Sequence, residues 1–252
     1  MTPELVRAVV LRTRPFSETS LWVRLYSEAH GKITGISKGA RRGTERIYTP
    51  FLEVECNGYP PRGAEHGLWT LARPEVTNDW RALVTDSDRL PYAFSILELV
   101  ECTVLEMHPQ PELYGALTRV LTRMSAASAQ KAPGLLFWFA LALINALGFA
   151  LQHEICPRCG RPLVFPVGAL VSAAGGVLCK ACSPPAAPSL SQDVWELLVT
   201  LSDEEEPGLR AINLETRDQF IGALQAYLSY HCERPVRLKS LGLLADYGSY
   251  GA

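Results

Sequence analysis

The chain of 252 residues is 48% hydrophobic and 20% charged. These are the values of a globular protein with a sizeable core in one to three domains, and they exclude an intrinsically disordered chain. The net charge of −2 gives no indication of a nucleic-acid partner. However, residues 1–76 hold 11 Lys and Arg against 8 Asp and Glu, a net charge of +3, whereas residues 77–252 hold 13 against 18, a net charge of −5. A polyanionic partner is therefore expected at the N-terminal part of the chain.

Five short strands are predicted in the first 75 residues, at residues 4–14, 20–27, 32–38, 51–57 and 67–72. The clearest alternation is in the second of them, where Leu21, Val23 and Leu25 face one side and Trp22, Arg24 and Tyr26 face the other. In the fourth, Leu52, Val54 and Cys56 alternate with Glu53 and Glu55. Because five short antiparallel strands leave no room for a second sheet, they predict a small barrel of the OB-fold type.

The segment between the third and fourth predicted strands is basic. Its cations are Lys38, Arg41, Arg42 and Arg46, which lie within nine residues. On a loop beside a barrel such side chains suit phosphate contacts, and Trp22 and Tyr26 are available to stack bases. A solvated loop whose charges keep the protein soluble is an equally good interpretation, and both aromatic side chains also fit half-buried positions in a sheet.

From residue 79 onward the hydrophobic period is that of helices. Ser87 and Asp88 predict the start of a helix that runs towards Met107. Its expected apolar stripe comprises Ile96, Leu97, Val100, Val104 and Leu105. Further helices are predicted at residues 112–125, after Ser189 or Ser191, and at residues 214–231 with Asn213 as the N-cap.

Residues 135–151 form the most apolar stretch and carry no charge. Their 17 positions are at the lower limit of a membrane span, but Asn145, Gly148 and the preceding Pro133-Gly134 favour a helix that is buried inside a domain. A membrane helix is the less favoured alternative.

Four cysteines form two C-x-x-C pairs, Cys156 with Cys159 and Cys179 with Cys182, separated by 19 residues. Two residues between cysteines let both sulfurs of a tight turn face one tetrahedral centre, and two such turns joined by a hairpin make a zinc ribbon. A shell of four thiolates leaves no position for water, so this Zn²⁺ is predicted to be structural. Two disulfides or a dithiol redox site are the alternatives.

The remaining sequence gives little indication of catalysis. Cys56, Cys102 and Cys232 follow no spacing pattern, and the first residues carry charges and no cleavage site, which predicts a reducing, cytoplasmic location. We find no phosphate-binding glycine loop, serine elbow or H-E-x-x-H motif. His153 lies three residues before Cys156 and is a candidate to substitute for a cysteine ligand or to support the ligands, but a histidine at a helix end is the simpler interpretation. A binding role is therefore favoured over an enzyme.

Three stretches spread in order over nearly the whole chain carry a resemblance. They are RPFSETSLWVRLYSEAHGKITGISKGARR, then LGFALQHEICPRCG with AAGGVLCKAC, and AYLSYHCERPVRLKSLGLL. In these stretches the chain resembles the RecO family of bacterial recombination mediators. The K-G-A-R-R loop and the R-L-K-S-L ending are more specific for that family than the cysteine spacing is.

The resemblance implies an α+β fold with a five-stranded OB-fold barrel at residues 1–78. An α-helical domain at residues 79–152 and 186–252 would follow, with a four-cysteine zinc ribbon at residues 153–185 inserted in it. It further implies binding of single- and double-stranded DNA without sequence preference, annealing of complementary strands and, with RecR, loading of RecA onto DNA coated by SSB. RecR is expected near the N-terminal domain, and the SSB C-terminal tail on the helical body. No membrane association is expected, and the location would be the cytoplasm at the nucleoid.

Carried onto this sequence, the DNA contacts of the family fall on basic side chains, and the mechanism would be electrostatic and non-catalytic. The loop candidates are Lys38, Arg41, Arg42 and Arg46, and the weaker candidates are Arg14, Arg24, Lys32, Arg237 and Lys239. Two other classes remain open: a zinc-ribbon nucleic-acid-binding module of transcription or translation, and an enzyme with a structural zinc. The K-G-A-R-R loop argues against both.

Overall fold

The structure is a computed structural model that describes residues 2–41, 48–61, 67–204 and 211–242. The chain forms two compact units. The barrel unit comprises Met1–Leu90 and Val100–Ser125, and the helical unit comprises Pro91–Leu99 and Ala126–Ala252. The first helix therefore contributes residues to both units.

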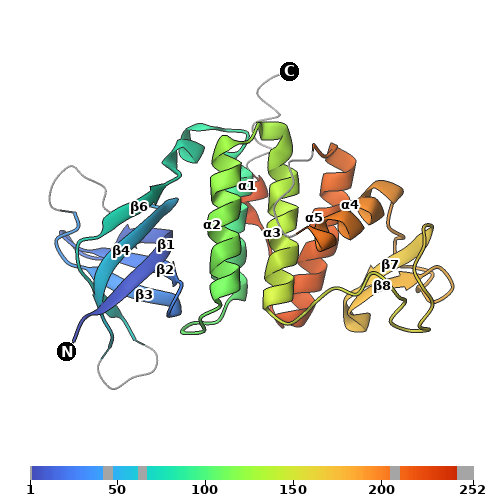
Figure 1. The fold of residues 1–252 in the computed structure, drawn as a ribbon, viewed down its shortest axis with the longest axis horizontal. Helices are drawn as coiled ribbons and strands as arrows, with labels where there is room; N and C mark the ends of the chain where they lie inside the picture. The colour runs from blue at the N-terminus through green and yellow to red at the C-terminus, as the bar shows by residue number, and fades with distance from the viewer. Residues whose placement is uncertain (1, 42–47, 62–66, 205–210, 243–252) are drawn as a thin grey trace. The chain divides into compact units, whose positions relative to one another are not determined.

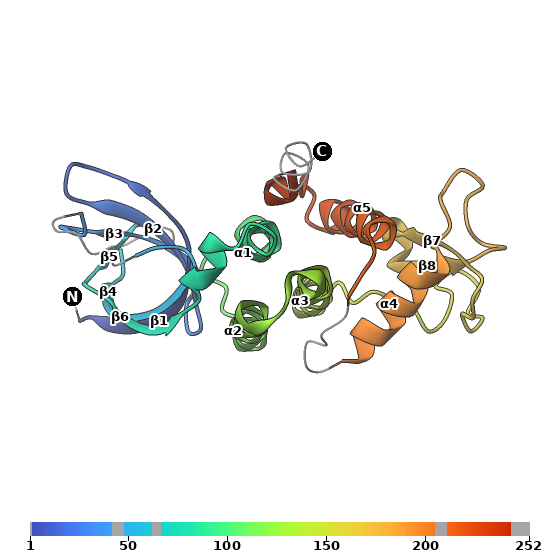
Figure 2. The ribbon, with the colours of Figure 1, turned by 90° about the horizontal axis from the view of Figure 1, so that it is seen from above.

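In the described part of the chain, six strands form the sheet of the barrel unit (Figures 1 and 2). The order β1-β2-β3-β5-β4 closes on itself because β1 also pairs with β4, and β6 continues the sheet beside β4. Strands β3 and β5 are parallel, and the other pairs are antiparallel. The strands are β1 (Glu4–Pro15), β2 (Leu21–Ser27), β3 (Gly31–Ser37), β4 (Leu52–Tyr59), β5 (Trp69–Leu71) and β6 (Glu75–Asp79). The predicted five-stranded OB-fold barrel is confirmed.

The barrel core follows from the alternation of the strands. Apolar side chains at every second position point inward, and burying a Val, Leu or Ile side chain contributes about 1.5–3 kcal/mol. The same alternation directs the polar and aromatic positions of β1 and β2 to the outer face. The core includes Val6, Ala8, Val10, Val23, Leu25, Ile33, Leu52, Val54 and Trp69.

Strand β6 is an element that the sequence does not predict. Its residues, Glu-Val-Thr-Asn-Asp, show no hydrophobic alternation, and all five are exposed. The strand forms because its backbone pairs with the buried strand β4, through Leu52 with Asp79 and Glu55 with Glu75. Pairing of the backbone carries no side-chain signature in this case.

Helix α1 (Leu90–Thr103) differs from its prediction at both ends. The carboxylate of Asp86, rather than Ser87 or Asp88, accepts the backbone N–H groups of Asp88 (3.2 Å) and Arg89 (2.9 Å) ahead of the helix. The helix stops at Thr103 instead of reaching Met107. As a result Leu105, which the predicted apolar stripe included, is 66% exposed.

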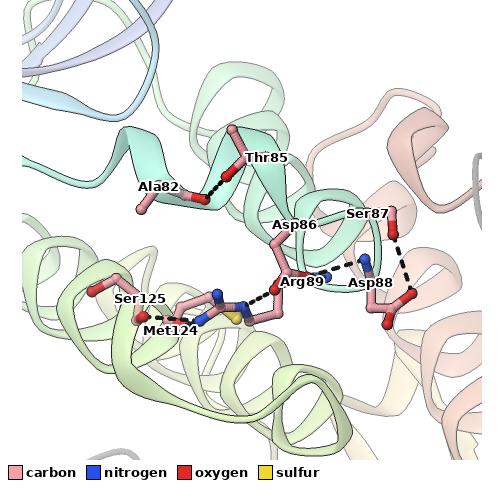
Figure 3. Close-up of polar contacts among 8 residues, drawn as sticks. All are labelled: Ala82, Thr85, Asp86, Ser87, Asp88, Arg89, Met124 and Ser125. Atoms are coloured by element: carbon pink, nitrogen blue, oxygen red, sulfur yellow. Dashed lines mark hydrogen bonds and ion pairs between the residues drawn. The ribbon is translucent and has the colours of Figure 1, made fainter.

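Arg89 joins the start of α1 to the end of α2 (Pro111–Ala126) (Figure 3). Its Nε donates to Asp86 (2.8 Å), and its Nη1 donates to the backbone carbonyls of Met124 (3.0 Å) and Ser125 (2.8 Å). A cation here satisfies carbonyls that have no partner within the helix and complements the helix dipole. Burial acts to raise the pKa of Asp86, but the hydrogen bonds from Arg89 outweigh it and lower that pKa.

The helical unit is built around α3 (Ala132–Ala146), which carries most of the apolar stretch predicted to be buried. Twelve of its 15 residues are buried, and Phe137 stacks on Phe220 with ring centroids 4.2 Å apart. The stretch is therefore buried up to Ile144, whereas residues 145–151 are half-buried or exposed. Within the residues that the structure covers, no helix is both long enough and apolar enough to cross a membrane.

Two further helices of this unit begin at the predicted caps. Ser191 Oγ accepts the N–H of Val194 (3.4 Å) before α4 (Gln192–Asp203), and Asn213 Oδ1 accepts the N–H of Thr216 (2.8 Å) before α5 (Leu214–His231). Between α3 and α4 a hairpin of two antiparallel strands ends at Cys179, the first residue of the second cysteine pair. These elements are α4 (Gln192–Asp203), α5 (Leu214–His231), β7 (Val167–Val171) and β8 (Gly176–Cys179), with short 3₁₀ helices at Arg81–Thr85, Ala129–Lys131, Ser172–Ala174 and Lys239–Gly242.

Candidate metal centre and nucleic-acid interface

The four cysteines of the two C-x-x-C pairs lie together in the helical unit. Cys156 opens a turn in which its N–H donates to the Arg161 carbonyl (2.8 Å) and its own carbonyl accepts the N–H of Gly160 (2.8 Å). Gly160 has a φ of +71°, a conformation that favours glycine. Cys179 ends β8, and a second turn brings Cys182 beside it. All four Sγ atoms lie within 4.8 Å of one another.

This geometry fits a tetrahedral metal ion. A Zn–S bond of about 2.3 Å separates the sulfurs of a tetrahedron by about 3.8 Å. The Sγ atoms of Cys159 and Cys179 are 3.8 Å apart. Four thiolates at this spacing can hold one metal ion in a closed shell, so the donor set and the distances agree on metal binding.

The backbone around Cys156 favours its thiolate form, whereas hydrogen bonds with the Cys159 and Cys179 side chains raise the pKa of Cys182 to about 12. Burial acts to raise the pKa of Cys156, but the backbone N–H groups of Cys179, Cys159 and Arg158 outweigh it and lower that pKa to about 6. The cations Arg158, Arg161 and Lys180 are exposed within two residues of the cysteines. Four thiolates around a divalent ion carry a charge of −2, which these cations offset.

Among the residues that the structure describes, the cluster contains the four cysteines and no other ligand type. The Nδ1 of His153 lies 3.2 Å from the carbonyl oxygen of Leu151, and the residue stands in the loop after α3 (Ala132–Ala146), so the interpretation as a histidine at a helix end is wrong. Cys56 is buried in the barrel core, and Cys102 and Cys232 lie apart from the cluster.

Arg14, Trp22 and Arg24 form a cation–π cluster on the outer side of β1 and β2. Arg14 and Trp22 are direct cross-strand partners. The guanidinium carbon of Arg14 lies 4.2 Å from the Trp22 ring centroid, and that of Arg24 lies 5.3 Å from it. A partly exposed ring flanked by two guanidinium groups can stack a base and contact its phosphates.

Lys38 and Arg41 extend this surface. Both are exposed. Arg41 ties the segment after β3 to the loop between β1 and β2, through Nη1 to the Ser17 carbonyl (2.6 Å) and its backbone N–H to the Thr19 carbonyl (3.1 Å). The other two loop candidates, Arg42 and Arg46, lie outside the described residues. We call Arg14, Trp22, Arg24, Lys38 and Arg41 the open face, together with Phe16, which is 59% exposed on the loop between β1 and β2.

Lys32 and Tyr26 lie on the same side of the sheet but are covered. Lys32 is 5% exposed, and its Nζ donates to the carbonyls of Glu101 (2.7 Å) and Val104 at the end of α1. Tyr26 is fully buried with its ring centroid 6.2 Å from that of Tyr114. Because these partners cover both side chains, neither is accessible to a ligand. Lys32 is therefore not a DNA contact in this structure, contrary to the expectation from the sequence.

Arg237 and Lys239 are exposed on the segment that follows α5 in the helical unit. This segment runs back along α5, since the N–H of Val236 donates to Ser229 Oγ (2.9 Å) and the N–H of Leu238 donates to Gln225 Oε1 (2.9 Å). The two cations form a separate candidate surface.

Sequence reasoning missed two residues of the barrel unit. Phe16 is 59% exposed on the β1–β2 loop, and the available signal was a lone aromatic residue between Pro15 and Ser17, outside any alternating run. Glu53 is fully buried, because Arg7 Nε (3.0 Å), Tyr114 OH (2.6 Å) and Asn78 all donate to its carboxylate. Burial acts to raise the pKa of Glu53, but the hydrogen bonds from Tyr114, Asn78 and Arg7 outweigh it and lower that pKa.

The open face lies where OB-folds bind oligonucleotides, which is the face of their second and third strands and the loop between the first two strands. The fold and its sites therefore define an OB-fold protein with an oligonucleotide-type face and a four-cysteine metal-type module. Two family models match the chain: Recombination protein O N terminal over residues 1–78, and Recombination protein O C terminal over residues 84–241. The chain belongs to the recombination protein O (RecO) family.

Curated relatives agree with this assignment. The chain is 30% identical over 247 residues to a DNA repair protein RecO of Pelobacter propionicus, covering 97% of both chains. It is 28% identical over 245 residues to the DNA repair protein RecO of Myxococcus xanthus, covering 96% of both. Family membership supports a role in DNA repair and recombination.

Proposed function

We propose that this protein binds single- and double-stranded DNA without sequence preference through the open face of the barrel and anneals complementary strands. The observation that carries the proposal is Trp22, partly exposed between Arg14 and Arg24 on the face that OB-folds use for oligonucleotides. Membership of the RecO family adds support. Arg41, Lys38 and the loop candidates Arg42 and Arg46 would extend the contact along the phosphate backbone.

The proposed mechanism is electrostatic and requires no catalysis. Lysine and arginine side chains displace counterions from phosphates, so affinity falls as the salt concentration rises. When one protein neutralises two strands, their mutual repulsion decreases and complementary bases can pair. The partly exposed ring of Trp22 and the exposed ring of Phe16 add stacking that does not depend on the base.

We propose that Cys156, Cys159, Cys179 and Cys182 hold a structural Zn²⁺. The metal would supply four bonds that fix the two turns and the β7–β8 hairpin in the helical unit. The 3.8 Å spacing of Cys159 and Cys179 supports a tetrahedral ion of this size. The four-cysteine module would correspond to residues 153–185.

The partners that we propose follow from the family. Together with RecR the protein would help to load RecA onto DNA coated by SSB, whose acidic C-terminal tail would bind the helical body. It would act in the cytoplasm at the nucleoid. Arg237 and Lys239 are proposed as a second, weaker DNA-binding surface.

The test is annealing of two complementary oligonucleotides, each coated with SSB. Wild type is compared with Arg14→Glu/Trp22→Ala and with Lys38→Glu/Arg41→Glu. The matched control is Arg161→Glu/Lys180→Glu, which changes the net charge by the same four units as the second variant but lies on the four-cysteine module. Circular dichroism and metal content establish that each variant is folded.

Fast annealing by wild type and the control, with loss in both open-face variants, is the expected result. If the control loses as much activity as Lys38→Glu/Arg41→Glu, net charge rather than the open face determines annealing. If wild type neither binds DNA nor anneals it at low salt, the proposed function is wrong.

A further inference from the structure

The segment that follows α1 covers one end of the outer face of the barrel. Glu106 forms an isolated parallel β-bridge with Lys32 of β3, and the backbone N–H of Met107 donates to the Lys32 carbonyl (3.0 Å). The phenol of Tyr26 donates to the carbonyl of Gln110 (3.4 Å). Residues 104–110 therefore lie against the same face whose other end is the open face.

This covering segment and the last turn of α1 each bring a carboxylate to a cation of the outer face. Glu106 forms an ion pair with Arg24, whose side chain is 19% exposed. Glu101, in the last turn of α1, lies 3.5 Å from the guanidinium of Arg12. The guanidinium of Arg24 therefore contacts two groups, the carboxylate of Glu106 and the Trp22 ring of the open face.

We propose that Glu106 occupies the position of a nucleic-acid phosphate at Arg24 and acts as a built-in competitor of single-stranded DNA for this cation. The proposal rests on the proposed function and adds a self-limiting contact to it. A carboxylate presents its oxygens to a guanidinium as a phosphate does. The Glu106 side chain is 43% exposed, so it can turn into solvent when a phosphate replaces it.

As a consequence, the affinity for single-stranded DNA is lower, and it depends less on salt concentration, than the cations of the open face would give without Glu106. When DNA displaces Glu106, the freed carboxylate takes up a cation from solution and so cancels one of the cations that the phosphates release. Without the carboxylate, Arg24 would bind a phosphate directly. The number of counterions released on binding would then rise by the amount that corresponds to about one additional phosphate contact.

The experiment measures binding of the full chain to a fluorescent oligo-dT at several salt concentrations. Glu106→Gln keeps the size of the side chain and removes its charge, and Glu112→Gln is the matched control on the exposed first turn of α2. We expect Glu106→Gln to bind about twofold to fivefold more tightly at low salt, the range that an exposed ion pair spans. The slope of log affinity against log salt should steepen by about 0.7. Thermal unfolding shows whether the variant is folded.

A double-mutant cycle assigns the effect to Arg24. In an Arg24→Gln background, Glu106→Gln should leave the affinity unchanged. Equal affinity and slope for Glu106→Gln and wild type, or weaker binding by Glu106→Gln, would overturn the proposal, since Glu106 would then be a passive neighbour or would position Arg24 for DNA. These outcomes are distinct from a failure of the proposed function, in which wild type itself shows no salt-dependent binding.

Discussion

The phenol of Tyr114 on α2 donates a 2.6 Å hydrogen bond to the fully buried carboxylate of Glu53 on β4. Arg7 of β1 and Asn78 of β6 donate to the same carboxylate. A buried carboxylate is tolerated only when donors replace its lost hydration. Three strands and one helix are therefore joined at a single charged group.

Replacement of Tyr114 by Phe should destabilise the barrel unit. The change keeps the ring but removes one donor from Glu53, and a buried acceptor that loses its partner costs about 1–3 kcal/mol. Urea unfolding followed by circular dichroism measures the loss. Tyr59→Phe is the control, because Tyr59 is partly exposed at the end of β4. Equal losses in the two variants would contradict a special role of the bond to Glu53.

The Glu53 network should make stability depend on pH on the acid side. Because hydrogen bonds from Tyr114, Asn78 and Arg7 lower the pKa of Glu53 in the folded state, the charged form stabilises the fold. This contribution is complete above the ordinary glutamate pKa of about 4.3 and is lost as the pH falls below it towards the lowered value. The free energy of unfolding, measured between pH 6 and pH 3, should therefore fall less steeply in Glu53→Gln than in wild type. Parallel curves would argue against a lowered pKa.

Loss of two cysteines should remove the metal and destabilise the helical unit. In Cys156→Ser/Cys159→Ser, two of four thiolates are missing, so a closed shell cannot form. Elemental analysis should find about one zinc ion per chain in wild type and in the control Cys232→Ser, and much less in the double variant. The melting temperature of the double variant should fall. An unchanged melting temperature after loss of zinc would show that the metal does not stabilise the fold.

Removal of the Trp22 ring should weaken binding of single-stranded DNA. Trp22→Leu deletes the stacking surface and the contact with Arg14 and Arg24, and stacking of one base on an aromatic ring contributes about 1–3 kcal/mol. Fluorescence anisotropy of a labelled oligo-dT measures the change. Phe165→Leu serves as the control, because it removes an exposed aromatic ring of the helical unit. Unchanged affinity in Trp22→Leu would move the DNA-binding surface away from β2.

The sequence predicts the elements whose signal is local. Alternation identifies the strands of the barrel, and Asn213 and Ser191 are recognised as helix caps because capping involves neighbouring residues. It does not predict features that depend on packing between distant segments. Tyr26, Lys32 and Glu53 all stand at outward positions of their strands, and they are buried because residues 101–114 lie over them.

The candidate sites follow the same division. The cysteine spacing predicts a metal cluster directly, since each C-x-x-C pair is a local turn. The basic residues are predicted as a class, but sequence cannot separate exposed Arg14 from buried Lys32, because both stand at outward strand positions. The pairing of Arg24 with Glu106 joins residues 82 positions apart and has no local signature.

The network at Glu53 also has a consequence for how such chains change over generations. The family model of the N-terminal part ends at residue 78, whereas Tyr114 and the carbonyl acceptors of Lys32 lie beyond it. If recombination replaced only the N-terminal segment by that of another lineage, the new segment would lack the partners with which it had evolved. Substitutions at Glu53 should therefore be accompanied by substitutions at Tyr114. For the same reason, residues 1–78 should be inherited together with the segment that contains Tyr114, and recombination between relatives should rarely separate them.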